Sequence, residues 1–301
     1  MKKFLVVVAG PTASGKTSLA IELALHFKTE IISCDSRQFF KELTIGTAKP
    51  TGEQLKKVKH HFINSLFASE EYHAGQFEED ALKLLDKLFK AKDVVIMTGG
   101  SGLYIEAVCS GFDHLPERDE TLRSELKEIL SSQGIGALQE KLKTLDEEYF
   151  ARVDINNPQR LMRAVEVCIL TGKKYSQLRQ HKTAERNFSV IKIGVDVERG
   201  LLYERINKRA DEMITHGLLD EAKSVYKFRK ANALQTVGYK ELFDYIDGKI
   251  SLEEAVELIK RNTRRYAKRQ LTWFKKDKEF IWFKPGDMTK IISHIQQKLN
   301  K

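Results

Sequence analysis

Residues 10–17 read GPTASGKT and directly follow the apolar run FLVVVA at residues 4–9. The segment matches the G-x-x-x-x-G-K-T pattern of a phosphate-binding loop (P-loop), placed between a predicted strand and a predicted helix. In such a loop the backbone N–H groups surround phosphate oxygens, and the helix beginning near Lys16 adds the positive end of its dipole. Lys16 would supply a mobile positive charge, and the Thr17 hydroxyl would bind Mg²⁺. The motif therefore predicts a ligand that carries a diphosphate, in preference to a glycine-rich turn without a ligand.

Two arginines extend this predicted site. Arg205 and Arg209 have the i, i+4 spacing of one helix face and follow the predicted strand 190–197. P-loop transferases place a lid arginine at this point, so we expect one of the two to contact the diphosphate. The alternative is an exposed ion pair. The residues expected to bind diphosphate are Gly10, Pro11, Thr12, Ala13, Ser14, Gly15, Lys16, Thr17, Arg205 and Arg209.

The segments around the loop alternate between strand and helix patterns. Strands are predicted at 4–9, 30–34, 93–98, 190–197 and 280–283, and helices at 16–27, 78–90, from residues 201, 231 and 252, and at the C-terminus. This order predicts an α/β fold, a parallel sheet of the P-loop NTPase type flanked by helices. Residues 115–188 are helical in pattern and strongly charged, which predicts a helical insertion domain between core segments 1–114 and 189–301.

Composition restricts the class of protein. The chain has 301 residues, is 42% hydrophobic and contains five prolines, as expected of a globular protein. No run approaches the roughly 18 apolar residues that cross a bilayer. The cysteines Cys34, Cys109 and Cys168 have no C-x-x-C spacing, so neither a zinc site nor a disulfide framework is indicated. We expect a cytoplasmic protein without a membrane partner, and no feature demands more than a monomer.

One segment concentrates the positive charge. The net charge is +9, and residues 260–276 (KRNTRRYAKRQLTWFKK) contain eight basic residues and no acid. Helical phasing places Arg261, Arg264 or Arg265, Lys268 and Lys275 on one stripe, and Tyr266, Gln270 and Trp273 on another. The segment is either a solvated face of a helix or a surface that binds a polyphosphate. The absence of acids favours nucleic acid as the partner.

Two further segments belong near the P-loop. Ligands of parallel sheets bind beyond the carboxyl ends of the strands, where DSRQ at 35–38 and GGSG at 99–102 follow predicted strands. Asp35 could hold Mg²⁺ through water, accept a proton from a nucleophile, or simply cap the following turn. The glycines let the backbone approach a ligand, and Ser101 offers a hydroxyl. Strand 93–98 ends in Thr98 and supplies no Walker-B carboxylate, which argues against a motor-type ATPase.

Seven motifs together resemble a known family. They are GPTASGKT, DSRQ, IGTAKP at 45–50, GGSGLY at 99–104, NNPQRLMRAVEV at 156–167, VGYKEL at 237–242 and TRRYAKRQLTWF at 263–274. In this order, over nearly the whole chain, they resemble the tRNA dimethylallyltransferases (tRNA isopentenyltransferases). The resemblance implies transfer of a dimethylallyl group from dimethylallyl diphosphate to N6 of the adenosine 3′ of the anticodon (adenosine-37) in tRNA. Diphosphate would leave, and the P-loop, an ATP-binding motif elsewhere, would hold the prenyl donor.

The resemblance also implies roles for single residues. Asp35 would accept the proton of the attacking amine, and Ser101, where the family usually has Thr, would keep a hydroxyl hydrogen bond to substrate. Phe40 stands where a Tyr is expected. For Gln159, Arg160 and Arg163 the alternative to RNA contact is a solvated helix with salt bridges. Residues implied to contact the tRNA anticodon stem-loop are Asp35, Ser36, Arg37, Gln38, Ser101, Arg123, Gln159, Arg160, Leu161, Met162, Arg163, Gly238, Tyr239 and Lys240.

Two other functions compete with this interpretation. A P-loop small-molecule kinase, with Asp35 as base for an acceptor hydroxyl, would explain residues 1–40 but neither the basic segment nor the 156–167 motif. A non-catalytic RNA-binding protein with a regulatory nucleotide site would be expected to lack Asp35 or Lys16, and both are present.

Overall fold

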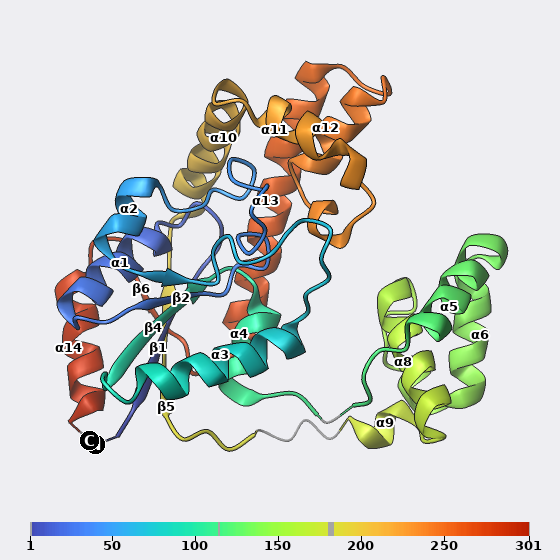
Figure 1. The fold of residues 1–301 in the computed structure, drawn as a ribbon, viewed down its shortest axis with the longest axis horizontal. Helices are drawn as coiled ribbons and strands as arrows, with labels where there is room; N and C mark the ends of the chain where they lie inside the picture. Colours follow the sequence, from blue (N-terminus) through green and yellow to red (C-terminus); the bar gives the residue numbers. More distant parts are fainter. Residues whose placement is uncertain (1, 114, 180–183, 301) are drawn as a thin grey trace. The chain divides into compact units, whose positions relative to one another are not determined.

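The computed structural model describes residues 2–113, 115–179 and 184–300. The chain divides into two compact units (Figure 1): unit 1 is Met1–Cys109 with Arg186–Lys301, and unit 2 is Ser110–Glu185. The sequence had suggested an insertion at 115–188. The proposed end of the first core segment, residue 114, and residues 180–183 of the insertion lie outside the described residues.

Unit 1 is built on a six-stranded parallel sheet with the order β3-β2-β4-β1-β5-β6. The strands are β1 (Phe4–Ala9), β2 (Ile31–Ser33), β3 (His60–His61), β4 (Val94–Gly99), β5 (Ser189–Val195) and β6 (Ile281–Phe283). The predicted parallel α/β fold is therefore confirmed. Strand β3 was not expected, because two histidines at a sheet edge carry no alternating apolar signal. The His61 side chain contacts the Glu30 carboxylate at 2.6 Å.

Alternate side chains of the central strand enter two different cores. Leu5 and Val7 of β1 pack with helices α3 (Ala74–Leu88) and α4 (Gly102–Ser110). Val6 and Val8 pack with α1 (Lys16–His26) and α14 (Met288–Leu299) on the other face. All six residues of β1 are buried, as expected for a parallel strand covered by helices on both sides. The short helix α2 (Gly52–Lys57) starts at a Thr51 capping box.

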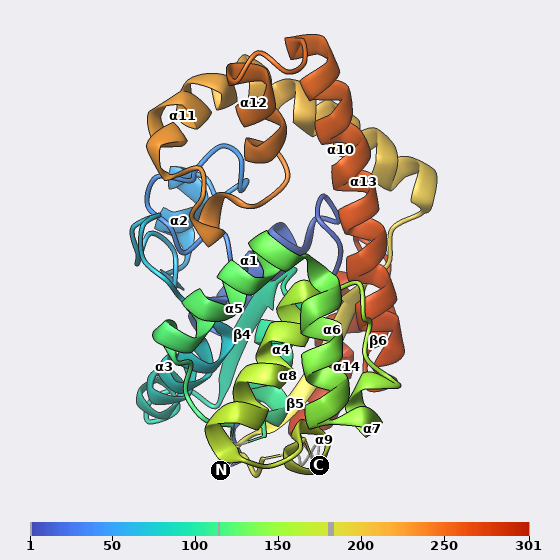
Figure 2. The same cartoon turned by 90° about the vertical axis from the view of Figure 1, so that its right-hand side faces the viewer.

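Four helices between β5 and β6 complete unit 1: α10 (Arg199–Thr215), α11 (Leu218–Val225), α12 (Tyr239–Ile246) and α13 (Leu252–Lys276). Helix α13 runs from the α11–α12 group down to the sheet (Figure 2). The expectation of a helix starting at residue 231 was wrong, since only a 3₁₀ turn forms at Asn232–Leu234. Glycines set these boundaries: Gly217 (φ 95°) separates α10 from α11, and Gly238 (φ 100°) precedes α12.

Unit 2 is helical, with α5 (Glu120–Gln133), α6 (Ile135–Leu145), α7 (Glu147–Phe150), α8 (Pro158–Thr171) and α9 (Tyr175–Leu178). Its own apolar core joins α5, α6 and α8 through residues such as Leu126, Leu138 and Val165. Across both units, none of the helices that the structure describes is long and apolar enough to cross a membrane.

Candidate active site at the carboxyl ends of the strands

The P-loop turns sharply between β1 and α1. The Ser14 N–H donates to the Pro11 carbonyl at 3.2 Å, and both Ala13 (φ 63°) and Gly15 (φ 88°) have left-handed backbone conformations. Gly15 meets this requirement without strain because it has no Cβ, whereas Ala13 adopts it at some cost. The loop therefore curls over the start of α1, as a phosphate-binding loop must.

A cavity of about 440 Å³ opens next to this loop. It lies where β1, β2 and β4 end side by side, with Ser33 of β2 in register with Thr98 of β4. The lining residues are Thr12, Ala13, Gly15, Lys16, Thr17, Ser18, Ser33, Asp35, Gln38, Thr47, Ala48, Pro50, Gln54, His60, Thr98, Gly99, Arg205 and Arg209. The structure thus brings Asp35, the P-loop and both predicted lid arginines into one space.

Another hollow, of about 470 Å³, lies along α10 and the residue after it. Its lining includes the carboxylates of Glu204, Asp211 and Glu212, which would repel a diphosphate. The P-loop cavity is therefore the better candidate for an anionic ligand.

Positive charge concentrates at the P-loop end of the cavity. Burial lowers the pKa of Lys16, an effect that nearby Asp35 opposes and Arg209 reinforces. Burial also lowers the pKa of Arg209, again opposed by Asp35. Arg209 donates from Nη2 to the Thr12 hydroxyl at 2.6 Å, and Lys16 donates to the Pro11 carbonyl at 3.3 Å. Two desolvated cations and one carboxylate therefore face the same small space.

The DSRQ segment is held in a tight turn beside the cavity. The Arg37 N–H donates to Asp35 Oδ1 at 3.1 Å, so the capping alternative for Asp35 describes a contact that does form. Ser101 does not line the cavity; its hydroxyl accepts from the Ser36 N–H at 3.0 Å and contacts the Ser36 hydroxyl at 3.1 Å. Arg37 donates to the Asn232 carbonyl at 2.8 Å. Ser101 therefore ties the glycine-rich turn after β4 to the residue that follows Asp35.

Gln38 holds another part of the cavity lining in place. Its Nε2 donates to the carbonyls of Thr47 and Ala48, both at 3.2 Å, and its Oε1 accepts from Ser33. All these contacts are internal to the protein. The Gln38 amide thus shapes the pocket through the 45–50 motif.

The 237–242 motif has a structural task that corrects one prediction. Tyr239, expected to contact RNA, is fully buried, and its hydroxyl donates to Glu221 at 2.6 Å. The same carboxylate accepts the N–H groups of Thr44, Ile45 and Gly46 at 2.8–3.0 Å. Tyr239 therefore supports the loop that leads to the cavity wall and does not face a ligand. Its neighbour Gly238 is also buried, whereas Lys240 is exposed.

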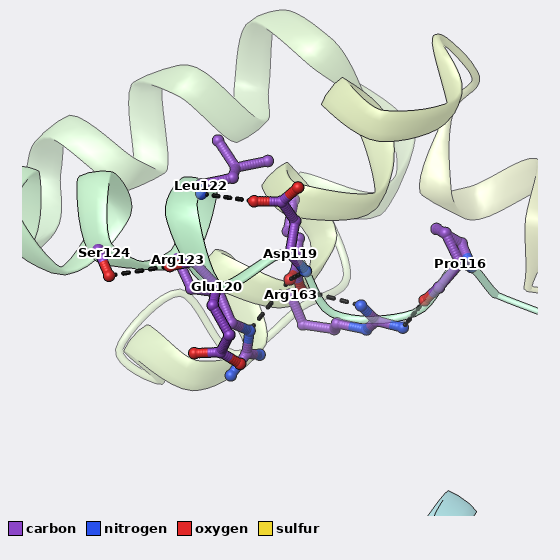
Figure 3. Close-up of polar contacts among 8 residues, drawn as sticks. Pro116, Asp119, Glu120, Leu122, Arg123, Ser124 and Arg163 are labelled. Carbon is purple, nitrogen blue, oxygen red and sulfur yellow. Dashed lines mark hydrogen bonds and ion pairs between the residues drawn. The ribbon is translucent and has the colours of Figure 1, made fainter.

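In unit 2, two of the arginines predicted to contact RNA hold a buried carboxylate. Arg123 Nε and Arg163 Nη1 donate to fully buried Glu166 at 3.1 and 2.9 Å. Arg163 also donates to the Pro116 carbonyl at 2.8 Å (Figure 3). The same figure shows Asp119 capping α5 through the Leu122 N–H. The arginines thus fasten α5 and the segment before it to α8.

The rest of the 156–167 motif divides by burial. Leu161 (0% exposed) and Met162 (3%) lie in the core of unit 2, which corrects the prediction that they contact tRNA. Their helix positions follow Gln159 and Arg160, whose side chains are exposed at the start of α8. Gln159 and Arg160 are therefore accessible to a ligand without rearrangement, whereas Leu161 and Met162 are not.

The basic segment forms the C-terminal half of α13. Arg261, Arg265, Lys268 and Arg269 are exposed, whereas Arg264 donates to Asn207 at 2.5 Å. On the other stripe, Gln270 is buried and Trp273 is 42% exposed. Burial, and secondarily the charge of Asp35, raise the pKa of Tyr266 to about 12. This helix therefore has an exposed cationic face and an inner edge close to Asp35, which the sequence pattern alone could not connect.

Comparisons with known proteins agree with this geometry. The IPP transferase family model matches residues 38–277. A tRNA dimethylallyltransferase from Christiangramia forsetii is 50% identical over 301 residues, covering 100% of both chains. The solved tRNA isopentenylpyrophosphate transferase of Bacillus halodurans is 39% identical, with a TM-score of 0.74 and coverage of 100% of this chain and 97% of its own. A eukaryotic dimethylallyltransferase acting on tRNA is 25% identical, with a TM-score of 0.79 and coverage of 99% and 77%, respectively.

Proposed function

We propose that this chain, which belongs to the IPP transferase family and transfers a dimethylallyl group to tRNA, takes that group from dimethylallyl diphosphate. The diphosphate of this donor binds in the P-loop cavity. The acceptor in this proposal is N6 of adenosine-37, in the anticodon stem-loop. The observation that carries it is the shared cavity: Lys16 and Arg209 lie at its P-loop end, and Asp35 lines it from the segment that follows strand β2.

The P-loop end suits the leaving group. When the allylic C–O bond breaks, negative charge develops on the departing diphosphate. Lys16, Arg209 and the loop amides are placed to stabilise that charge, and their partial desolvation strengthens the interaction. Arg205 lines the same cavity and adds a third cation.

Asp35 suits the acceptor. As the C–N bond forms, the exocyclic amine must lose a proton, and the Asp35 carboxylate in the same cavity accepts it. Because the cavity is recessed, adenine has to leave its stack to enter, which costs a few kcal/mol and less in a loop than in a helix. The Ser101–Ser36 contact keeps the DSRQ turn against the β4 turn during this step.

The donor set of the cavity fits Mg²⁺ bound together with the diphosphate. Thr17 offers a hard oxygen ligand there, and Mg²⁺ commonly takes one or two protein ligands plus substrate phosphates. The described residues contain no group of three or more His, Cys, Asp and Glu side chains able to hold a metal by themselves. In this proposal Thr17 ligates the ion, which offsets the charge of the diphosphate.

For the tRNA we propose two surfaces, one on each unit. The exposed basic residues of α13 would contact phosphates, and Gln159 and Arg160 of α8 would contact the anticodon stem-loop. A small-molecule kinase is not favoured, because the relatives that match this chain over its full length are tRNA transferases.

Donor identity provides the test. Purified protein is incubated with unmodified tRNA and either dimethylallyl diphosphate labelled in the prenyl group or ATP labelled in the γ-phosphate. We expect label in tRNA only from the prenyl donor, together with release of one diphosphate per transfer and no tRNA-stimulated ATP hydrolysis. Transfer from ATP, or ATP hydrolysis that rises with tRNA, would overturn the donor assignment.

A further inference from the structure

Gln270 of α13 connects two separate parts of the active site. Its side chain is 5% exposed, although it comes from the most basic segment of the chain. Its Oε1 accepts the Thr12 N–H of the P-loop at 2.9 Å, and its Nε2 donates to the Gly100 carbonyl at 2.8 Å. Each end of one amide thus holds a different loop, and a flip of the amide would lose both contacts.

The glycine-rich turn after β4 is shaped to admit this helix. A Cβ on Gly100 would lie 2.2 Å from Gln270 Nε2, and a Cβ on Gly102 would lie 2.3 Å from the Trp273 ring. A side chain at either position would force Gln270 or Trp273 to move. These two glycines are therefore required by the close approach of α13.

The residues that Gln270 holds belong to opposite sides of the reaction. Thr12 is fixed through its N–H by Gln270 and through its hydroxyl by Arg209. Gly100 directly precedes Ser101, whose hydroxyl holds the Ser36 N–H beside Asp35. The chain of contacts runs from the P-loop through Gln270 to the turn that carries the proposed base.

We propose that Gln270 is a positioning residue, which sets the distance between the diphosphate held by the P-loop and the acceptor held beside Asp35. The inference rests on the proposed function, because it assigns donor and acceptor to those two sides. Transfer needs the two reacting atoms about 3–3.5 Å apart, and a misplacement of roughly 1 Å can lower a rate about 100-fold. Gln270 touches neither substrate and acts through the two loops.

Two substitutions separate the two contacts. Gln270→Met keeps the length of the side chain and loses both hydrogen bonds. Gln270→Glu keeps an acceptor for the Thr12 N–H but loses the donor to Gly100 and places a carboxylate against that carbonyl. Thr272→Ala, at an exposed position two residues along α13, is the matched control. Each variant is characterised by thermal unfolding, single-turnover prenyl transfer, and separate binding of prenyl diphosphate and tRNA.

We expect Gln270→Met to lower the single-turnover rate about 10- to 100-fold, while both dissociation constants stay within about threefold of wild type. Gln270→Glu should also slow transfer. Because Glu has nearly the same size and shape as Gln, this variant tests the proposal if Gln270→Met does not fold. Thr272→Ala should match wild type. A folded Gln270 variant with a wild-type transfer rate, or one whose loss is confined to donor affinity, would refute the proposal. Failure of the wild-type protein to transfer a prenyl group would instead refute the proposed function.

Discussion

The Arg209 guanidinium donates a hydrogen bond to the Thr12 hydroxyl at 2.6 Å, which joins helix α10 to the P-loop. Arg205, one turn earlier, lines the same cavity, although no hydrogen bond to the loop is seen for it among the described residues. The sequence left open which of the two contacts the diphosphate, and the geometry favours Arg209.

Replacement of Arg209 should therefore affect the donor. Arg209→Gln is expected to lower the transfer rate about 100- to 1000-fold, the range for losing one group that stabilises a developing anion, with tRNA affinity unchanged. Lys208→Gln removes a neighbouring exposed charge outside the cavity and should behave as wild type. Single-turnover kinetics at saturating donor measure the effect; equal losses in both variants would point to net charge alone.

The buried carboxylate of unit 2 supports a stability prediction. Glu166 is the shared partner of Arg123 and Arg163, so Glu166→Gln leaves two partly buried guanidinium groups without their counter-charge. We expect unit 2 to lose on the order of 3–5 kcal/mol of stability. The control Glu79→Gln removes an exposed i,i+4 pair and should change stability by less than about 1 kcal/mol. Hydrogen exchange followed by mass spectrometry resolves α5 and α8; unchanged protection there would contradict the expectation.

Lys49 should make the free energy of unfolding depend on pH, in a direction that follows from its pKa. Burial lowers its pKa to about 8, against the opposing effect of Glu221 and Glu42. Between pH 8 and 10.5 unfolded Lys49 keeps its proton while folded Lys49 has lost it, so the unfolded state binds more protons. The stability that depends on Lys49 must then rise with pH across this interval.

Urea unfolding of wild type and Lys49→Gln at pH 8 and pH 10 measures this contribution. The free energy of unfolding of wild type minus that of the variant should increase between the two values. A constant difference would show that Lys49 titrates normally in the folded protein, and a decrease would show that folding raises its pKa; either result would contradict the prediction.

The basic face of α13 predicts a salt-dependent tRNA affinity. Arg265 and Lys268 are exposed, and each lost phosphate contact should reduce the slope of log affinity against log salt by roughly 0.7–0.9. Replacing both by Gln should lower the affinity for all substrate tRNAs about equally, since phosphate contacts carry no sequence information. Lys83→Gln on α3 is an exposed control. Binding titrations of tRNA from low to high salt measure this slope. A slope that is the same in the double variant and in wild type would mean that this face of α13 is solvated and does not bind tRNA.

The sequence predicted the parts of the fold that have strong local signals. The P-loop has a recognisable motif, and the strands are marked by their apolar runs. The position of Asp35 beside the P-loop follows from the rule that ligands of a parallel sheet bind at the carboxyl ends of its strands. The two-residue strand β3 and the break at Gly238 were missed, because they depend on sheet pairing and on a left-handed glycine.

Burial explains the errors at the site. Tyr239, Leu161 and Met162 belong to motifs that resemble RNA-contacting segments, yet their side chains fill cores. Gln270 was assigned to a stripe of the basic helix, and its bonds to Thr12 and Gly100 join residues 258 and 170 positions apart. No local pattern reports such contacts, since they exist only once the chain has folded.

Asp35 carries the central claim, that one cavity holds both the leaving diphosphate and the base for the acceptor amine. The most direct measurement is single-turnover prenyl transfer by Asp35→Asn, with the dissociation constants of prenyl diphosphate and tRNA determined in parallel. The account predicts a rate about two to four orders of magnitude below wild type, with both substrates still bound, as for removal of a general base. A rate near that of wild type, accompanied by a large change in the Mg²⁺ requirement, would contradict it and make Asp35 a metal-shell group.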